Sequence, residues 1–170
     1  FRAGRKIELL LHGASISAQP AQNRDIALTT ESRFMRPEQA AQEVAALITR
    51  CQSAGYASFF KKLDSTMRGN PGIETEAALK ATGLKAALIC TAMPRTGRTC
   101  IKDTIYLNGR PLHTTDIGSD PFHPITTSSV ASLLRLQTSL PIGHLSLDEV
   151  ESGDASLSET IGSQIAQGKR

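Results

Sequence analysis

Arginine residues stand in three predicted loops, each beside hydroxyl-bearing or glycine residues. The loops read Glu31-Ser32-Arg33, Asp64-Ser65-Thr66-Met67-Arg68-Gly69-Asn70 and Pro94-Arg95-Thr96-Gly97-Arg98-Thr99, and each follows an apolar run that predicts a strand. Ligands of open parallel sheets bind beyond the carboxyl ends of the strands, so we expect the loops to converge there. Guanidinium groups, hydroxyls and free amides at the start of the next helix are suited to a small carboxylate or phosphate.

Two lysines, Lys61 and Lys62, end a predicted strand just before Asp64. Side chains alternate along a strand, so one of the lysines could hold an anionic ligand beside Asp64 and Ser65. A surface ion pair is the alternative for these lysines, and ordinary solvated charge is the alternative for each loop arginine. Arg68 has a further alternative as a structural clamp that pairs with Asp64 or Glu74.

Short apolar runs and amphipathic helices alternate along the chain and must position these loops. Runs at 7–11, 26–30, 56–63, 85–91 and 142–147 predict strands. Pro37 opens one predicted helix that stops at Gly55, and an Ala-rich helix over 73–82 ends at Gly83. We predict an α/β fold: a mostly parallel sheet with helices on both faces.

The second half of the sequence predicts an inserted β-hairpin and two more helices. Asn108-Gly109 favours a two-residue turn between 104–107 and 110–113, and Pro111 limits its strand to an edge. Thr127 or Ser128 is expected to cap a helix. Ser156-Leu157-Ser158-Glu159 fits a capping box that opens the final helix.

Composition excludes several classes of protein. The 170 residues are 39% hydrophobic and 21% charged, which is typical of one globular domain. No apolar run approaches the roughly 18 residues of a membrane span. A net charge of +3 and the absence of Trp argue against a nucleic-acid partner. Cys51, Cys90 and Cys100 match neither a zinc site nor a disulfide framework, so we expect core or near-core thiols in a cytoplasmic protein.

Several common enzyme motifs are absent from the sequence. It contains no G-x-x-x-x-G-K-[ST] phosphate loop, no G-x-G-x-x-G loop, no G-x-S-x-G elbow and no H-E-x-x-H motif. The histidines, His12, His113, His123 and His144, are scattered, so we predict no metal site. His113 and His123 are expected to be structural or exposed.

One long segment reads Phe60-Lys61-Lys62-Leu63-Asp64-Ser65-Thr66-Met67-Arg68-Gly69-Asn70-Pro71-Gly72-Ile73-Glu74. This segment resembles the K-K-x-D-S-T-x-R-G-N-x-G-x-E segment of the four-carbon acid sugar kinase family. Further stretches agree in order: Thr30-Glu31-Ser32-Arg33, Pro94-Arg95-Thr96-Gly97-Arg98-Thr99, Tyr106-Leu107-Asn108-Gly109-Arg110-Pro111-Leu112 and Asp120-Pro121-Phe122-His123-Pro124. The resemblance spans residues 26–138. Members are two-domain enzymes that use ATP with Mg²⁺ to phosphorylate D-threonate, D-erythronate or 3-oxo-tetronate.

The resemblance implies a set of substrate-binding residues. They are Arg33, Lys61, Lys62, Asp64, Ser65 and Arg68. In the implied arrangement Arg33 and Arg68 hold the carboxylate of the acid sugar. One of the lysines offsets charge on the transferred phosphate, and Asp64 with Ser65 binds hydroxyls.

The resemblance also implies that residues 1–170 are an acid-sugar-binding N-terminal domain. The family's D-D-x-T-G loop, which holds the expected proton acceptor, is missing from the sequence and is expected before Phe1, so no catalytic residue is assigned. The ATP-binding domain is expected beyond Arg170. Thr114-Thr115 departs from the family's usual acidic-Thr pair, which leaves open which four-carbon acid is bound. The alternatives are a non-catalytic anion-binding or regulatory α/β domain and a domain that mediates contacts within a homo-oligomer.

Overall fold

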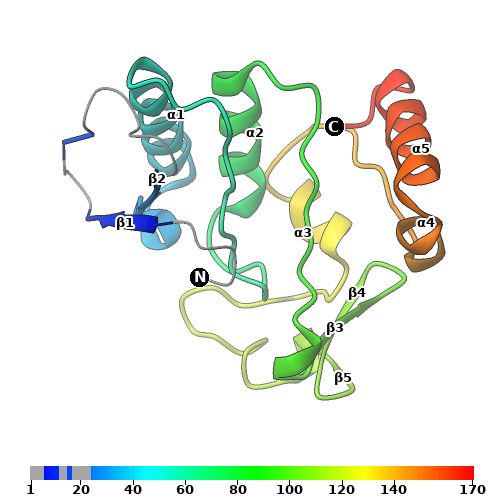
Figure 1. Cartoon of the computed structure of the whole chain (residues 1–170). Helices are drawn as coiled ribbons and strands as arrows, with labels where there is room; N and C mark the ends of the chain where they lie inside the picture. The colour runs from blue at the N-terminus through cyan, green and yellow to red at the C-terminus, as the bar shows by residue number, and fades with distance from the viewer. Residues whose placement is uncertain (1–5, 12–14, 17–23) are drawn as a thin grey trace.

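The computed structural model describes residues 6–11, 15–16 and 24–170, and His12 lies outside these ranges. The first elements are two short strands, β1 (Lys6–Leu10) and β2 (Arg24–Leu28), which pair in parallel with Ile7 opposite Asp25 and Leu10 opposite Leu28. They lie at one side of the molecule, next to helix α1 (Figure 1). The strands predicted at 7–11 and 26–30 are therefore confirmed, with bounds shifted by one or two residues.

Helices α1 (Pro37–Ser53) and α2 (Pro71–Thr82) follow and pack side by side (Figure 1). Val44 and Ile48 on α1 meet Ala77 on α2, and the small side chain of Ala77 lets the helices approach closely. Each helix has Pro in its first turn, where the missing N–H costs no intrahelical hydrogen bond. Both predicted helices are confirmed, and Gly83 ends α2 in the left-handed conformation.

The predicted α/β class is confirmed, since the chain combines helices with small sheets, but the predicted mostly parallel sheet is found only in part. The described residues form one parallel pair, β1–β2, and one antiparallel sheet of order β3-β4-β5. The segments predicted as strands at 56–63, 85–91 and 142–147 carry no strand assignment. A strand needs a hydrogen-bonded neighbour, and the apolar runs alone do not supply one. Their side chains are also not all covered: Phe60 is 92% exposed and Leu88 is 71% exposed.

The predicted hairpin is confirmed. Strands β3 (Arg98–Ile101), β4 (Thr104–Leu107) and β5 (Arg110–Pro111) form the antiparallel sheet, with Leu107 opposite Arg110. Asn108 and Gly109 both have positive φ, 50° and 77°, as a two-residue hairpin turn of this kind requires. Pro111 lies on the edge strand β5, as predicted, and the chain then turns into the short 3₁₀ helix η3 (Leu112–Thr114).

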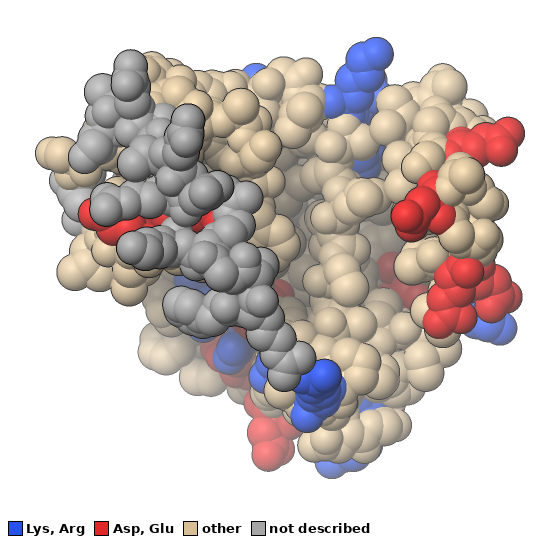
Figure 2. Space-filling model, viewed as in Figure 1, with Lys and Arg blue, Asp and Glu red and all other residues tan. Residues whose placement is uncertain are grey.

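The last third of the chain carries three helices joined by irregular segments, α3 (Val130–Arg135), α4 (Leu147–Glu151) and α5 (Asp154–Ala166). The predicted caps are wrong in detail. Ser129 caps α3 by accepting from the Ser132 amide, and the capping box belongs to Ser146 and Glu149 at the start of α4. Helix α5 already begins at Asp154, so Ser156 lies inside it. Acidic side chains gather over α4 and α5 (Figure 2).

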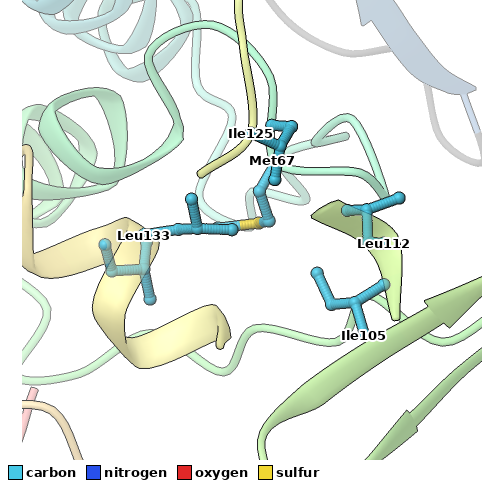
Figure 3. Packing of buried hydrophobic residues seen from close by; sticks show 6 residues of the cluster. Met67, Ile105, Leu112, Ile125 and Leu133 are labelled. Carbon is cyan, nitrogen blue, oxygen red and sulfur yellow. The ribbon is translucent and has the colours of Figure 1, made fainter. Parts of the chain in front are cut away.

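The main core lies between the hairpin, α3 and the loop that precedes α2. It contains Met67, Ile105, Leu112, Ile125, Leu133 and Leu134. Figure 3 shows the Met67 side chain reaching toward Leu133 on α3, with Ile105 and Leu112 on the other side. Met67 thus fastens the middle of the Asp64–Arg68 loop to the core, which fixes the backbone on either side of it.

The three cysteines are free thiols, but only one is buried. Cys51 on α1 is buried, whereas Cys90 and Cys100 are exposed, so the expectation of core or near-core positions is wrong for the last two. Cys90 lies in the segment before η2 (Pro94–Thr96), and Cys100 lies on β3. Among the described residues, no helix combines the length and apolar character needed to cross a bilayer.

Candidate functional site

A cavity of about 550 Å³ lies where the loop after β2 meets the segment before α2 and the first turn of that helix. Its lining includes η1 (Ser32–Phe34), the lysine pair Lys61 and Lys62, Asp64, and Arg68. The buried residues Asn70, Pro71 and Glu74 also line it. Two of the three arginine-bearing loops therefore converge as the sequence predicts.

The Asp64 carboxylate joins these two loops. Its Oδ2 atom accepts hydrogen bonds from Arg68 Nε at 2.7 Å and from Thr66 Oγ1 at 2.8 Å. Arg33 Nη2 lies 3.7 Å from the same oxygen. Burial raises the pKa of Asp64, but the hydrogen bonds from Arg68 and Thr66 outweigh it and bring the pKa below its ordinary value. Asp64 is therefore held ionised, between two guanidinium groups.

The backbone conformation at Met67 orients the side chains of Thr66 and Arg68 toward Asp64. Met67 has φ of 60°, a left-handed conformation that is unusual for a residue with a side chain, and its amide donates to the Asp64 carbonyl at 2.8 Å. Its side chain is only 2% exposed. The core contacts of Met67 offset the backbone strain, and the tight turn lets both Thr66 and Arg68 reach Asp64.

A second carboxylate, Glu74, organises the lysine side of the cavity. It lies in the first turn of α2, is buried, and accepts from Ser32 Oγ at 2.6 Å. Its other oxygen pairs with the ammonium of Lys61. Ser32 Oγ is also 2.7 Å from Thr30 Oγ1, so the loop after β2 is tied to α2 through side chains.

Asn70 and Gly69 fix the position of Arg33. The Asn70 side chain donates to the carbonyls of Ser32 and Met35, at 2.9 and 3.0 Å. Gly69 has φ of 84°, and a Cβ there would lie 3.0 Å from Cγ of Arg33. Only glycine combines this backbone conformation with so close an approach. In the sequence Arg68-Gly69-Asn70, Arg68 is thus itself a candidate to bind the ligand. Gly69 and Asn70 position a second candidate, Arg33.

The cations of the cavity differ in how far they are neutralised. Lys61 faces Glu74, and Arg68 faces both Asp64 and Asp120. Among the described residues Lys62 donates only to the carbonyl of Leu63, at 3.0 Å, and the Arg33 side chain is 45% exposed. Arg33 and Lys62 are therefore the cations best able to meet an incoming anion.

Five of the six predicted site residues line the cavity: Arg33, Lys61, Lys62, Asp64 and Arg68. Ser65 is buried and does not line it; the hydroxyl beside Asp64 is that of Thr66. The loop from Pro94 to Thr99 does not line it either. The expected free amides of α2 are also not all available, since Pro71 has no N–H and the Gly72 amide donates to Gln137 Oε1 at 2.7 Å.

Sequence reasoning missed several residues of the site, including Ser32, Asn70, Glu74 and Asp120. All four stand inside the quoted family stretches, so these stretches carried a signal for them. Asp120 comes from a distant loop. His113 is structural, with Nδ1 2.8 Å from Ser128 Oγ, whereas the His123 ring lies 5.2 Å from that of Phe34 on the cavity lining.

Another cavity, of about 620 Å³, lies along α5 and contains none of the predicted site residues. Its lining includes His144, Glu149, Glu159 and Lys169. Within the described ranges, no group of three or more His, Cys, Asp or Glu residues is arranged to hold a metal ion. The cavity around Asp64 thus remains the candidate site, and its chemistry is that of an anion and hydroxyl binder.

Curated relatives share the whole or most of the chain. A D-threonate kinase of Salmonella typhimurium is 37% identical over 99% of this chain and 39% of its own length. A D-erythronate kinase of Heliobacterium modesticaldum is 33% identical over 85% of the chain and 33% of its own length. A 3-oxo-tetronate kinase of Pseudomonas fluorescens is 30% identical over 84% of the chain. The chain spans between a third and two fifths of these relatives.

Solved structures share the fold. A domain of unknown function from Bordetella bronchiseptica, crystallised with citrate as a domain-swapped dimer, is 36% identical, with a TM-score of 0.68 over 79% of this chain and 34% of its own. A Haemophilus influenzae protein is 20% identical, with a TM-score of 0.86 over 96% of this chain and 40% of its own. The family model described as a sugar-binding N-terminal domain matches residues 2–170, and the chain therefore belongs to that family, the one found in the four-carbon acid sugar kinases.

Proposed function

We propose that this chain binds the sugar acid in an enzyme that transfers phosphate from ATP to a hydroxyl of a four-carbon sugar acid. The observation that carries the proposal is the convergence of Arg33, Arg68, Lys61 and Lys62 around Asp64 in one cavity. The named activities of the relatives support it. In this proposal residues 1–170 are the acid-sugar-binding domain.

The available charges suggest how a tetronate would be held. Its carboxylate needs cationic donors, and Arg33 and Lys62 are the cations of the cavity that the described residues neutralise least. Arg68 uses Nε and Nη1 on Asp64 and Asp120, so its fork has further N–H donors to offer. Asp64, as an ionised carboxylate, accepts from substrate hydroxyls. Ser65 is buried beneath the cavity surface, and we propose that it supports the loop that carries Asp64.

The bound citrate of the Bordetella structure supports a preference for hydroxy acids. Citrate carries carboxylates and a hydroxyl, the groups that a tetronate also presents. The domain-swapped dimer of that protein supports the proposal that this chain, too, takes part in a homo-oligomer.

ATP with Mg²⁺ is the cofactor that the proposed reaction requires. The carboxylates Asp64, Glu74 and Asp120 are each paired with Arg or Lys, so they do not fit the role of Mg²⁺ ligands. We propose that ATP and Mg²⁺ are bound mainly by a separate domain of the full-length gene product. The contribution of this chain is to orient the acid and to stabilise charge, which are the main sources of catalysis in phosphoryl transfer.

Binding and turnover should be tested separately. Isothermal titration of this chain with D-threonate, D-erythronate and, as an uncharged control, threitol should give binding of at least one acid and none of threitol. The Arg33→Gln variant should lose that binding, and the matched surface variant Arg95→Gln should keep it. Equal affinity for threitol would overturn the proposed carboxylate site.

Turnover should be measured as ADP release by the full-length gene product and by this chain alone. We expect turnover with a tetronate from the full-length product and none from the chain alone. A full-length product that binds the acid without releasing ADP would establish the alternative of a non-catalytic anion-binding or regulatory domain. Robust turnover by the chain alone would show that the ATP site is misplaced.

A further inference from the structure

Asp120 lies outside the cavity lining and yet contacts one of the lining residues, Arg68. It is 52 residues beyond Arg68, in the loop between η3 and α3, and its Oδ2 atom accepts from Arg68 Nη1 at 3.0 Å. Its Oδ1 atom accepts from the backbone amides of Phe122 and His123, each at 2.9 Å. One carboxylate thus closes a turn with one oxygen and holds an arginine with the other.

The turn that Asp120 closes reaches the rim of the cavity. The Phe122 ring meets Phe34 edge to face, with centroids 6.2 Å apart and an angle of 88° between the planes. The His123 ring lies 5.2 Å from the same phenyl ring. Phe34 lines the cavity and follows Arg33 in the chain. The Asp120 loop therefore braces the cavity at Arg68 and, through Phe34, beside Arg33.

Two anchors restrict an arginine more than one does. With Nε bound to Asp64 alone, the planar guanidinium group could still rotate about its bonds to the Arg68 stem. The second bond, from Nη1 to Asp120, fixes the plane of the group and leaves the remaining N–H donors in a set direction. Both acids are largely covered, with side chains 12% and 20% exposed, so water competes little for these bonds.

We infer that Asp120 is a positioning residue, which sets the plane of the Arg68 guanidinium group for the substrate carboxylate and holds the aromatic rim beside Arg33. The inference rests on the proposed function for its substrate, a four-carbon sugar acid. Asp120 itself does not line the cavity, so its effect must pass through Arg68 and the rim. The hydrogen bonds from the His123 and Phe122 amides also hold the pKa of Asp120 below its ordinary value, which keeps it anionic at neutral pH.

The test uses Asp120→Asn, which keeps an acceptor oxygen but removes the charge. In the full-length gene product we expect KM for the preferred tetronate to rise by roughly 3- to 30-fold, while kcat and Tm change little. Asp116→Asn removes an exposed acid of the same loop and should leave KM unchanged. In an Arg68→Lys background, Asp120→Asn should have little further effect, because the fork that it positions is gone. Fully additive effects of the two substitutions on KM would overturn the inference.

A second measurement does not depend on any substrate. NMR of the Arg68 Nε–H group reports rotation about its Nε–Cζ bond, and Asp120→Asn should speed this rotation severalfold while Asp116→Asn does not. Unchanged rotation in Asp120→Asn would overturn the inference, whatever the kinetics show. Faster rotation in a protein that binds no tetronate would support the positioning role and reject the proposed function, so the two failures are distinguishable.

Discussion

Lys61 and Lys62 are adjacent and line the same cavity, but only Lys61 is paired with a buried carboxylate, that of Glu74. Lys62 meets only a backbone carbonyl among the described residues. The two lysines therefore have different functions in the structure. Lys61 stabilises the junction of α2 with the preceding segment, and Lys62 remains available to an anion.

Glutamine substitutions should separate these functions. Lys61→Gln leaves the Glu74 carboxylate buried without its cation, so it should lower the free energy of unfolding by about 1–3 kcal/mol. Lys62→Gln should change it by less than about 0.5 kcal/mol and should weaken tetronate binding about fivefold, because one exposed positive charge is lost. Urea unfolding and isothermal titration measure the two effects. Equal loss of stability in both variants would contradict the difference between the lysines.

Arg68→Lys keeps the charge of Arg68 but removes the planar fork. We expect a lower kcat/KM for the tetronate. Expressed as lost transition-state stabilisation, the decrease should be about 1.5–3 kcal/mol, the range of a hydrogen bond to a charged group. Pairing with Asp64 and Asp120 also makes Arg68 a clamp, so Tm should fall by about 2–4 °C rather than stay constant. Arg95→Lys, at an exposed residue of η2, is the matched control. A variant that melts much earlier and keeps normal kinetics at low temperature would assign Arg68 to the clamp role alone.

Asn70→Ala removes the two bonds that fasten the η1 loop to the start of α2. Because the freed carbonyl of Ser32 is in a buried environment, we expect a loss of about 1–3 kcal/mol in the free energy of unfolding. Tetronate affinity should fall as well, since Arg33 is no longer held beside Asp64. Gln52→Ala, at an exposed position on α1, should leave both quantities nearly unchanged. Titration calorimetry and urea unfolding check this, and unaltered affinity in Asn70→Ala would remove Asn70 from the support of the site.

The lowered pKa of Asp64 makes its contribution to stability depend on pH. Burial raises this pKa, but the hydrogen bonds from Arg68 and Thr66 outweigh burial, so the folded-state value lies below the unfolded value of about 3.9. The stabilisation is therefore complete well above about pH 3.9 and is lost as the pH falls through the lower, folded-state pKa.

Urea unfolding of the wild type and of Asp64→Asn at several pH values measures this contribution. The difference in free energy of unfolding between them should be constant from pH 7 to about pH 5 and should shrink below about pH 4. A wild-type advantage that persists undiminished to pH 2 would mean that ionised Asp64 is not its source.

The sequence by itself determined the local elements and most of the site. Pro37 and Gly55 bound α1, Gly83 ends α2, and Asn108-Gly109 forms the hairpin turn, because each of these signals acts on the backbone within a few residues. The segment from Lys61 to Glu74 carried the resemblance to the family and four of the five predicted residues that line the cavity. Their short separation along the chain made that inference possible.

Only the tertiary structure decided which segments pair and which acids meet which cations. The apolar runs at 56–63 and 85–91 read as strands, but strand formation depends on a neighbour supplied by another part of the chain. Glu74 forms an ion pair with Lys61, and Arg68 forms ion pairs with both Asp64 and Asp120. These pairs form because the folded chain brings the side chains within hydrogen-bond distance and largely out of water. Pairing across 52 residues, as between Arg68 and Asp120, leaves no periodic signal in a sequence, since it depends on how the loops pack rather than on spacing.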